Sequence, residues 1–589
     1  MPWPTSMPLS GTAVRSLRGV LALCLVAGAL LAPPAADAQV PLRIIAVNDL
    51  HGHLEPGDNS VLVPHPHAPD RLVPVRSGGA AYLATRVQQL RAEVAASVFV
   101  SSGDLIGASP LVSALFRDEP TVEVMNRLGL DLGVAGNHEF DHGVAELRRM
   151  VAGGCAPEPR GATRSCADAA GRYEGMRFPL IAANVVDAAG APLLAGAVVH
   201  RVQGVAVAFV GAVTRATARI VMPQGIRGWR FEREAPAINR TVQALRAQGV
   251  HAFVAVIHEG GQTEGHFNEC REPRGEIFEI ARELDPEVRV ILSAHTHRGY
   301  VCALDGRLII QGASFGRLVS VVDLTLDAAR GTVQPGSIRA TNLTVPNGLD
   351  TALDAAVRAA HPALAPDRAV AEQVAGYRER AAPLADAPAG RIAAVFTRQA
   401  EDGGDHAAGR LIADAHLAAT RGAGAQAAFT NPGGVRSNLR PRGADGHVTY
   451  GDLFTMQPFG NSLVTLTLTG AQLKSLLESQ WSRSDPERVR FLQPSNGLSY
   501  GWRSDRPHGE RIEPGSLRLH GEPIRPQQAV RVTINSYLAA GGDGFVLFRE
   551  GRDLVGGPLD VDALTDYLLD RSRQEPLAPD PAPRIRRLD

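Results

Sequence analysis

This sequence of 589 residues has no excess of either charge and contains only five cysteines. Its 60 Lys and Arg residues nearly balance its 61 Asp and Glu residues, which argues against a polyanion-binding surface such as a nucleic-acid groove. Any phosphate binding is therefore expected to be local and built by a few residues. The chain is too long for a single hydrophobic core, so we expect two or more domains.

Long apolar runs are also absent after the N-terminal segment. Arg15 and Arg18 precede a short apolar run over Val20–Leu31, and a small-x-small cleavage pattern ends at Ala38. These features predict a signal peptide over 1–38. No later segment has about twenty consecutive apolar residues, so the sequence predicts no membrane span and a periplasmic or secreted protein.

Cleavage near Ala38 would leave four cysteines, Cys155, Cys166, Cys270 and Cys302. An even number in an oxidising compartment indicates two disulfides. Cys155 and Cys166 bracket a loop rich in Pro, Gly and Arg, which favours this pair and leaves Cys270 with Cys302. Three connectivities are possible in principle, and four free thiols remain the alternative. The spacing does not resemble a zinc site.

Short apolar, β-branched runs alternate with helical stretches from Leu42 to about Leu324, which is typical of βαβ units in an α/β domain. The expected helices are Ala80–Ala95, Ala235–Gln248 and Glu276–Leu284. The expected strands are Arg43–Val47, Val98–Ser101, Leu132–Ala135, Leu180–Ala183, Val205–Val210, Ala252–Ile257, Arg289–Leu292 and Leu308–Gln311.

The composition then changes, and it predicts further boundaries. A first domain over 39–345 is followed by an Ala-rich helical connector over 346–388, with short helices at Asp350–Ala360 and Asp367–Arg380. A second domain over 389–575 opens with a helix at Gly409–Thr420 and contains strands at Leu463–Leu468 and Val530–Ile534. The Pro- and Arg-rich segment 576–589 is expected to be a loose tail.

Five of the expected strands end in a polar cluster. Because ligands in α/β sheets gather at the carboxyl ends of strands, these clusters are expected to meet. A lone His is usually structural, but five clusters at equivalent positions favour a metal site. The clusters are Asn48-Asp49-Leu50-His51, Ser102-Gly103-Asp104, Gly136-Asn137-His138-Glu139-Phe140-Asp141, His258-Glu259-Gly260 and Ser293-Ala294-His295-Thr296-His297.

The side-chain types in these clusters suit divalent cations. Two cations about 3.5–4 Å apart are able to clamp both oxygens of an in-line phosphoryl displacement. An Asp, His and Asn set fits Zn, Mn, Fe or Co better than Ca. The clusters contain no cysteine, which argues against a closed structural zinc site.

The series D-x-H, G-D, G-N-H-E-x-D, H and H-x-H resembles that of calcineurin-like metallophosphoesterases. The resemblance implies an α/β/β/α sandwich in which Asp104 bridges two metal ions. One ion would be held by Asp49, His51 and His297, and the other by Asn137, His258 and His295.

The same resemblance places two catalytic residues beside the metals. His138 would lie near the leaving group, and Asp141 would orient it. The ordinary alternatives are a polar turn at 137–139 and a helix N-cap at Asp141. Four other polar residues share these loops without an assigned role: His53, Glu139, His142 and Glu259.

Three turns in the second domain carry aromatic, arginine and carboxylate side chains: Asn431-Pro432-Gly433-Gly434-Val435-Arg436, Met456-Gln457-Pro458-Phe459-Gly460-Asn461 and Ser536-Tyr537 through Asp543. Each turn alone is ordinary. Together they resemble the C-terminal α+β domain of 5′-nucleotidases, which implies that Phe459 and Tyr537 stack a base, that Asp543 binds ribose, and that Asn431 and Arg436 contact base, ribose or phosphate.

The resemblance has two departures. Many members have an arginine where this chain has Glu401–His406, and Arg398 and Arg410 are near without being clearly equivalent. Tyr537 stands where phenylalanine is common. The resemblance also implies that the second domain swings to deliver substrate.

The sequence therefore predicts an exported two-metal phosphomonoesterase of the 5′-nucleotidase type. Its partner is expected to be a small nucleotide rather than a nucleic-acid polymer. The alternatives are a 2′,3′-cyclic-nucleotide 2′-phosphodiesterase with 3′-nucleotidase activity, a UDP-sugar hydrolase and, more distantly, a sulfate-ester hydrolase. A periplasmic nucleotide-binding module with a decayed metal site is the non-enzymatic alternative.

Overall fold

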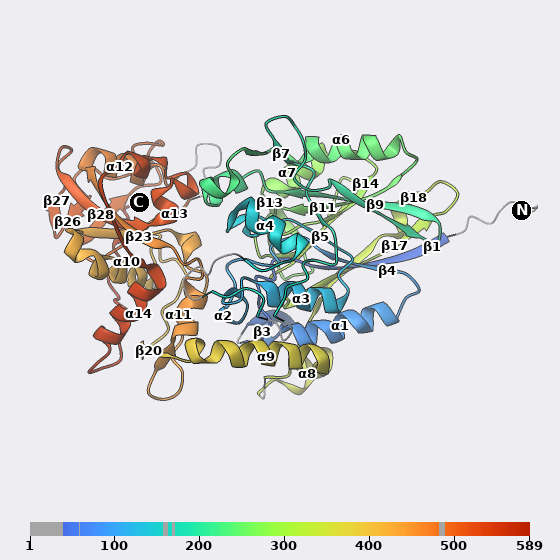
Figure 1. Cartoon of the computed structure of the whole chain (residues 1–589), viewed down its shortest axis with the longest axis horizontal. Coiled ribbons are helices and arrows are strands. Elements are labelled where there is room, and N and C mark those ends of the chain that lie inside the picture. Colours follow the sequence, from blue (N-terminus) through green and yellow to red (C-terminus); the bar gives the residue numbers. More distant parts are fainter. Residues whose placement is uncertain (1–38, 58, 157–162, 168–170, 351, 482–488) are drawn as a thin grey trace, which may run out of the picture. The chain divides into compact units, whose positions relative to one another are not determined.

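The computed structural model describes residues 39–57, 59–156, 163–167, 171–350, 352–481 and 489–589 (Figure 1). The signal peptide expected over 1–38 lies outside the described residues. Within the described part of the chain, no helix has the length and apolar character needed to cross a bilayer.

Two mixed sheets form the centre of the first domain. The first has the order β18-β17-β1-β4-β5-β6, with β19 paired to β17. Its strands β1, β4, β5 and β6 are parallel, and β17 to β19 are antiparallel. The bounds are β1 Gln39–Val47, β4 Ser97–Ser101, β5 Leu132–Val134, β6 Leu180–Ile181, β17 Leu318–Asp327, β18 Thr332–Val333 and β19 Arg339–Thr344.

The second sheet has the order β15-β16-β14-β11-β9-β8, in which the four inner strands are parallel and the two edge strands are antiparallel to their neighbours. Its inner strands read as continuous apolar runs because both faces are covered. The bounds are β8 Ala197–Val202, β9 Val205–Val213, β11 Ala252–His258, β14 Val288–Leu292, β15 Gly299–Leu304 and β16 Arg307–Gly312.

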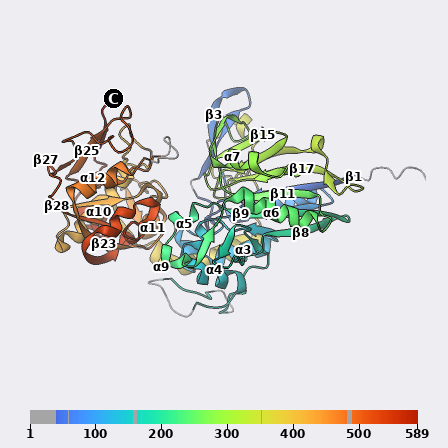
Figure 2. The ribbon, with the colours of Figure 1, turned by 90° about the horizontal axis from the view of Figure 1, so that it is seen from above.

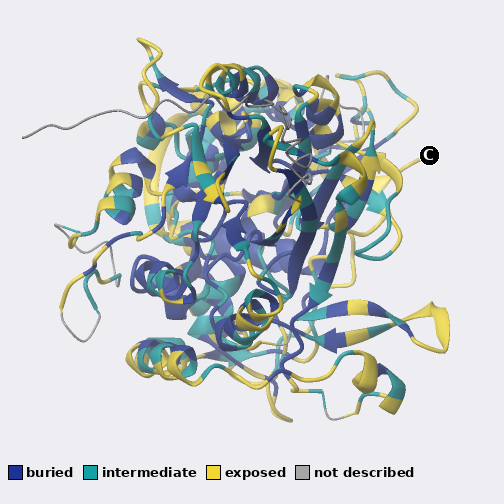
Figure 3. Ribbon diagram, turned by 90° about the vertical axis from the view of Figure 1, so that its right-hand side faces the viewer, coloured by how far each residue is buried: buried dark blue, intermediate teal, exposed yellow. Residues whose placement is uncertain are grey.

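Helices cover the outer face of each sheet. Figure 1 shows α6 (Glu234–Arg246) and α7 (Glu276–Glu283) on one side of the paired sheets, and α1 (Ala80–Ala92) and α3 (Glu119–Leu128) on the other. A core that includes Ile44 of β1 lies between the sheets, and separate cores lie beneath each helical layer. Figure 3 shows the central strands as buried and the outer surfaces as exposed. The expected α/β/β/α sandwich is confirmed.

All eight expected strands of this domain are present, and both expected disulfides join Cys155 to Cys166 and Cys270 to Cys302. A hairpin of β2 (Ser60–His65) and β3 (Ala68–Arg76) was not expected, because prolines interrupt its apolar pattern. Figure 2 shows the hairpin, in blue, projecting beyond the strands. Its buried valines pack in a small core with Val357.

The connector contains the two expected helices, as α8 (Ala355–Ala360) and α9 (Arg368–Ala385). The apolar side of α9 belongs to the core under the first sheet, through residues that include Val370, Val374 and Tyr377. This helix is therefore anchored on the first domain rather than free.

The second domain has a five-stranded sheet of order β24-β21-β28-β23-β29, covered by α10, α12 and α14. The expected helix and strands are found here with slightly longer bounds. These are β21 Ala427–Thr430, β23 Ser462–Thr469, β24 Gln493–Pro494, β28 Ala529–Asn535, β29 Arg552–Leu559, α10 Ala407–Thr420, α12 Gly470–Glu478 and α14 Asp560–Arg571.

The prediction of a loose tail over 576–589 is wrong for its last residues. Strand β30 (Ile585–Arg587) pairs in parallel with β25 (Leu498–Trp502), and Ile585 is fully buried. Arg584 donates two hydrogen bonds to the carboxylate of Asp414, at 2.7 and 2.8 Å. The Pro- and Arg-rich composition of this segment does not reveal these contacts, because β25 and Asp414 lie far away in the sequence.

Candidate metal centre and active site

The predicted ligands stand on loops that follow parallel strands of both sheets. β1, β4 and β5 lead to the clusters of the first sheet, and β11 and β14 lead to those of the second. Five of the ligands have left-handed backbone angles, with φ between 47° and 70°. Such angles are uncommon outside glycine and persist where the surrounding structure imposes them. The five are Asp49, His51, Asp104, His295 and His297.

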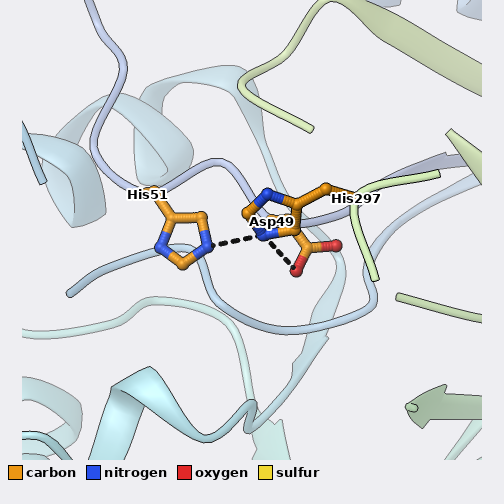
Figure 4. A group of neighbouring side chains, drawn as sticks. All are labelled: Asp49, His51 and His297. Atoms are coloured by element: carbon orange, nitrogen blue, oxygen red, sulfur yellow. Dashed lines mark hydrogen bonds and ion pairs between the residues drawn. The ribbon is translucent and has the colours of Figure 1, made fainter. Parts of the chain in front are cut away.

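The loops bring the side chains into three overlapping groups, in each of which the ligand atoms lie within 4.8 Å of one another. Figure 4 shows the first group, in which His297 Nε2 lies 3.3 Å from Asp49 Oδ1 and 3.1 Å from His51 Nε2. The groups are Asp49–His51–His297, His51–Asp104–His138 and Asp104–His258–His295.

His51 is shared by the first and second groups, and Asp104 is shared by the second and third. Its Oδ2 lies 3.0 Å from His258 Nε2 and 3.6 Å from His51 Nε2. Its other oxygen accepts a hydrogen bond from the backbone N–H of His138 at 2.9 Å. One oxygen of this buried carboxylate thus lies close to two imidazoles, a position that suits a ligand shared by two metal ions.

The hydrogen bonds of the two flanking imidazoles leave their Nε2 atoms available. His51 Nδ1 lies 2.8 Å from the carbonyl of Gly107, and His258 Nδ1 lies 2.9 Å from that of Ser102. Each Nδ1–H therefore donates to a carbonyl, and the Nε2 lone pairs face the Asp104 carboxylate. A proton or a metal ion between these atoms would relieve the repulsion between acceptors.

A buried atom without a partner fits the same cation. Asn137 is 3% exposed, and its Oδ1 has no hydrogen-bond partner among the described residues. Burial alone would lower the pKa of His258, but the carboxylates of Asp104 and Asp49 raise it to about 10. The site therefore attracts positive charge, and its donor set suits a divalent metal ion.

His138 and Asp141 are paired beside this centre. His138 Nδ1 lies 2.7 Å from Asp141 Oδ2. Burial opposes the charged imidazole, but Asp141 and Asp104 raise the pKa of His138 above its ordinary value. The His138 ring stacks against Phe459, with the centroids 5.8 Å apart and the planes 17° apart.

A cavity of about 840 Å³ contains the predicted substrate residues and part of the metal centre. Its volume is in the upper part of the range usual for small-molecule sites. The predicted residues that line it are Asn137, His138, Asp141, His295, Asn431, Arg436, Phe459, Tyr537 and Asp543.

The polar residues of the second domain form a connected network in this cavity. Asp543 accepts a hydrogen bond from Asn431 Nδ2 at 2.8 Å and another from the Tyr537 hydroxyl at 2.9 Å. Asn431 Oδ1 accepts in turn from Asn535 at 3.1 Å. The tyrosine therefore adds a bond that phenylalanine could not make, and it holds the Asp543 carboxylate in place.

Comparisons with known proteins agree with this two-part site. Residues 42–299 match the calcineurin-like phosphoesterase family, and residues 384–550 match the 5′-nucleotidase C-terminal domain. A cell wall protein of Listeria monocytogenes is 30% identical over 569 residues, which cover 91% of this chain and 68% of that protein. The chain belongs to the 5′-nucleotidase family.

The chain covers different shares of other similar proteins. The endonuclease YhcR of Bacillus subtilis is 31% identical over 92% of the chain, but the chain spans only 41% of that protein. The crystal structure of a 5′-nucleotidase precursor from Thermus thermophilus superposes with a TM-score of 0.71 at 25% identity, covering 93% of this chain and 99% of that one. The family comprises phosphoester hydrolases that use divalent metal ions.

The sequence leaves open whether Arg398 or Arg410 corresponds to the arginine of the 5′-nucleotidase pattern, and the structure distinguishes the two. Arg410 is buried in ion pairs with Asp405 and Glu401, at 2.9 and 2.6 Å. Arg398 instead donates to the backbone carbonyl of Arg436 at 2.8 Å. The guanidinium of Arg436 lies 5.8 Å from the Phe459 ring centroid. Arg398 is thus the arginine that stands next to the predicted substrate residues.

Two further residues of the site escape a motif-based prediction. Asn48 accepts from the Gly312 N–H at 2.9 Å and donates to Asp49 at 2.6 Å, so it orients a predicted ligand. Arg490 lines the cavity and donates to the carbonyl of Asp543 at 2.9 Å. Asn48 is the first residue of a recognised cluster, which is a usable signal, whereas nothing in the sequence around Arg490 distinguishes it.

Proposed function

We propose that this chain is an exported phosphomonoesterase that holds two divalent metal ions and hydrolyses nucleotides to nucleoside and phosphate. The observation that carries the proposal is the position of Asp104. Its Oδ2 lies close to both His51 and His258, and the buried Oδ1 of Asn137 has no hydrogen-bond partner among the described residues. The cavity at this centre also contains Phe459, which supports an aromatic substrate group.

The ligand assignment combines the first and third side-chain groups with Asn137. When bound, a pair of divalent ions activates water and neutralises charge on the phosphoryl oxygens. Zn, Mn, Fe or Co suits the donor set. In the proposal Asp49, His51 and His297 hold one ion, Asn137, His258 and His295 hold the other, and Asp104 contacts both.

His138 supplies the mobile proton of the proposed reaction. Its Nδ1–H is held by Asp141 Oδ2, so the Nε2–H is left to donate to a phosphoryl or leaving-group oxygen. Arg436 adds a second positive charge in the same cavity. Both side chains oppose the negative charge that builds up on phosphate as the ester bond breaks.

The second domain supplies the nucleoside contacts of the proposal. Phe459 and Tyr537 offer aromatic surfaces to a base, and each stacked base gains about 1–3 kcal/mol. The Asp543 carboxylate, oriented by Asn431 and Tyr537, suits ribose hydroxyls. Asn431 and Arg436 complete the contacts to base, ribose or phosphate.

Export is supported by the two disulfides, because disulfides persist mainly in oxidising compartments. We expect the mature protein to begin near Gln39. Mass spectrometry of the protein from periplasmic and extracellular fractions tests this start, and a chain that retains residues 1–38 in the cytoplasm would contradict it.

A substrate panel tests the proposed activity. Purified protein loaded with Mn²⁺ or Zn²⁺ is expected to release phosphate from 5′-AMP faster than from 3′-AMP, 2′,3′-cyclic AMP or UDP-glucose. A preference for the cyclic ester or for UDP-glucose would favour the corresponding phosphodiesterase or sugar-nucleotide reaction. A folded preparation that binds nucleotide, releases no phosphate and never holds more than one metal would instead indicate a binding module.

A further inference from the structure

A buried carboxylate beside the metal centre has no role in the proposed reaction. Glu139 is 4% exposed and lies in η1 (His138–Phe140), next to His138 and two residues after Asn137. Among the described residues it forms no ion pair with Arg, Lys or His. A buried charge without a cationic partner is costly unless hydrogen bonds satisfy it.

Backbone amides of two different loops satisfy this carboxylate. Glu139 Oε2 accepts from the N–H groups of Asp104 at 3.0 Å and Gly136 at 2.5 Å. Its Oε1 accepts from Leu105 at 2.9 Å and, more weakly, from Ile106 at 3.4 Å. One side chain therefore ties the loop after β4 to the loop after β5.

The loop after β4 needs such a partner because its backbone is unusual. Gly103 and Asp104 both have positive φ, at 96° and 51°. The next residues turn successive N–H groups towards one point, an arrangement that binds anions. A left-handed conformation at a non-glycine residue costs about 1 kcal/mol or more, and the Glu139 carboxylate offsets this cost.

The two loops also fit together closely around the bridging ligand. A Cβ atom at Gly136 would lie 2.5 Å from the backbone nitrogen of Asp104 and 2.1 Å from its Oδ1, so the two loops approach as only glycine allows. The same Oδ1 accepts from the His138 N–H. The direction of the Asp104 carboxylate is thus set by the pair of loops that Glu139 joins.

We propose that Glu139 is a positioning residue whose carboxylate locks these two loops together and so holds Asp104, Asn137 and His138 in register for metal binding. The inference rests on the proposed metal centre. Glu139 contacts neither a metal nor substrate in this arrangement. It acts through the backbone that carries a bridging ligand, a terminal ligand and the proton donor.

Glu139→Gln tests the inference, because its NH₂ group must face amide donors that the carboxylate accepted. We expect the dissociation constant for Mn²⁺, measured by calorimetric titration of the metal-free protein, to rise about 10- to 100-fold. At saturating Mn²⁺ the kcat for 5′-AMP falls, while KM stays within about twofold because no nucleoside contact changes. Glu139→Asp shortens the bridge, still presents a carboxylate, and should give an intermediate Mn²⁺ constant.

Glu478→Gln is the matched control. Glu478 is 5% exposed and likewise accepts from two successive backbone N–H groups, those of Arg511 and Ile512, but it lies in the second domain and also pairs with Lys474 at 3.1 Å. This variant should lower the thermal stability and leave the Mn²⁺ constant within twofold of wild type.

An unchanged Mn²⁺ constant in folded Glu139→Gln would overturn the inference and leave the metal centre intact. If Glu139→Gln does not fold, an unchanged dissociation constant for Mn²⁺ in Glu139→Asp would overturn the inference instead. Failure of the wild-type protein to bind Mn²⁺ would overturn the metal centre and this inference together.

Discussion

Asp104 and Phe459 contribute to one centre in different ways. The Asp104 carboxylate lies close to two imidazoles, so its charge belongs to the proposed metal site itself. Phe459 offers a ring surface and no ligand atom, and it lies against His138. Loss of the Asp104 carboxylate should therefore lower kcat, whereas loss of the Phe459 ring should raise KM.

Asp104→Asn should lower kcat for 5′-AMP about 10³-fold, because the amide supplies no charge to hold two cations together. Phe459→Ala should instead raise KM about 5- to 100-fold, the equivalent of one lost stacking contact. Steady-state kinetics at saturating metal measure both constants. Phe459→Tyr keeps the ring and should behave as wild type. An equal loss of kcat in Asp104→Asn and Phe459→Ala would contradict this division of labour.

His416 of α10 gives the second domain a pH-sensitive position. Burial lowers its pKa from 6.5 to about 4. Its Nε2 lies 3.4 Å from the Nε2 of Gln457, two residues before Phe459. Because the unfolded chain binds the proton more tightly, the folded state loses stability as the pH falls from 6.5 towards 4.

His416→Asn should remove this dependence. Relative to the variant, the wild-type protein is expected to lose about 3 kcal/mol of unfolding free energy between pH 7 and pH 4. Urea unfolding followed by tryptophan fluorescence at several pH values measures the difference. Parallel pH profiles for the two proteins would show that His416 is not the group responsible.

Among the elements, β30 shows how a short strand near the end of the chain stabilises a domain. Ile585 is fully buried in the same core as Trp481, Tyr500 and Trp502. Leu588, three residues later, is 44% exposed. The two positions differ in burial but lie in the same segment.

Ile585→Ala should therefore destabilise the second domain by about 2–5 kcal/mol, the usual cost of such a cavity in a core. Leu588→Ala is the control and should change stability by less than about 0.5–1 kcal/mol. Thermal or denaturant unfolding compares them. If the two substitutions have equal effects, β30 does not contribute to the core in solution.

At the scale of the whole molecule, the proposed metal centre lies between the two sheets of the sandwich. Its proposed ligands Asp49, His51, Asp104 and Asn137 follow strands of the first sheet, and His258, His295 and His297 stand at the ends of strands of the second. Ions bound between them stabilise the folded state over the unfolded chain.

Removal of metal with a chelator should lower the melting temperature, and Mn²⁺ or Zn²⁺ should restore it. At a free metal concentration of about 100 times the dissociation constant, the gain is about 2.7 kcal/mol. Differential scanning calorimetry measures the shift. The melting temperature of Asp104→Asn should shift much less on addition of metal. A shift equal to that of the wild-type protein would mean that the stabilising ion binds elsewhere.

The sequence by itself determined the features that depend on local patterns. Apolar runs identified the eight parallel strands of the sandwich, since buried parallel strands leave little freedom in residue type. Polar clusters at strand ends, such as Asn48–His51, identified the candidate ligands because parallel strands end at one edge of a sheet. Cysteine spacing favoured the pairing that the structure has.

Only the tertiary structure decided the features that depend on distant partners. Arg398 rather than Arg410 stands beside Arg436, β30 is part of a sheet, and Glu139 bonds to two loops. Glu139 lies within a recognised motif and Arg398 near a recognised turn, but neither pattern reveals the partner of the side chain, and the composition around β30 predicts a loose tail. Their roles come from contacts between segments far apart in the chain, which residue type and spacing do not encode.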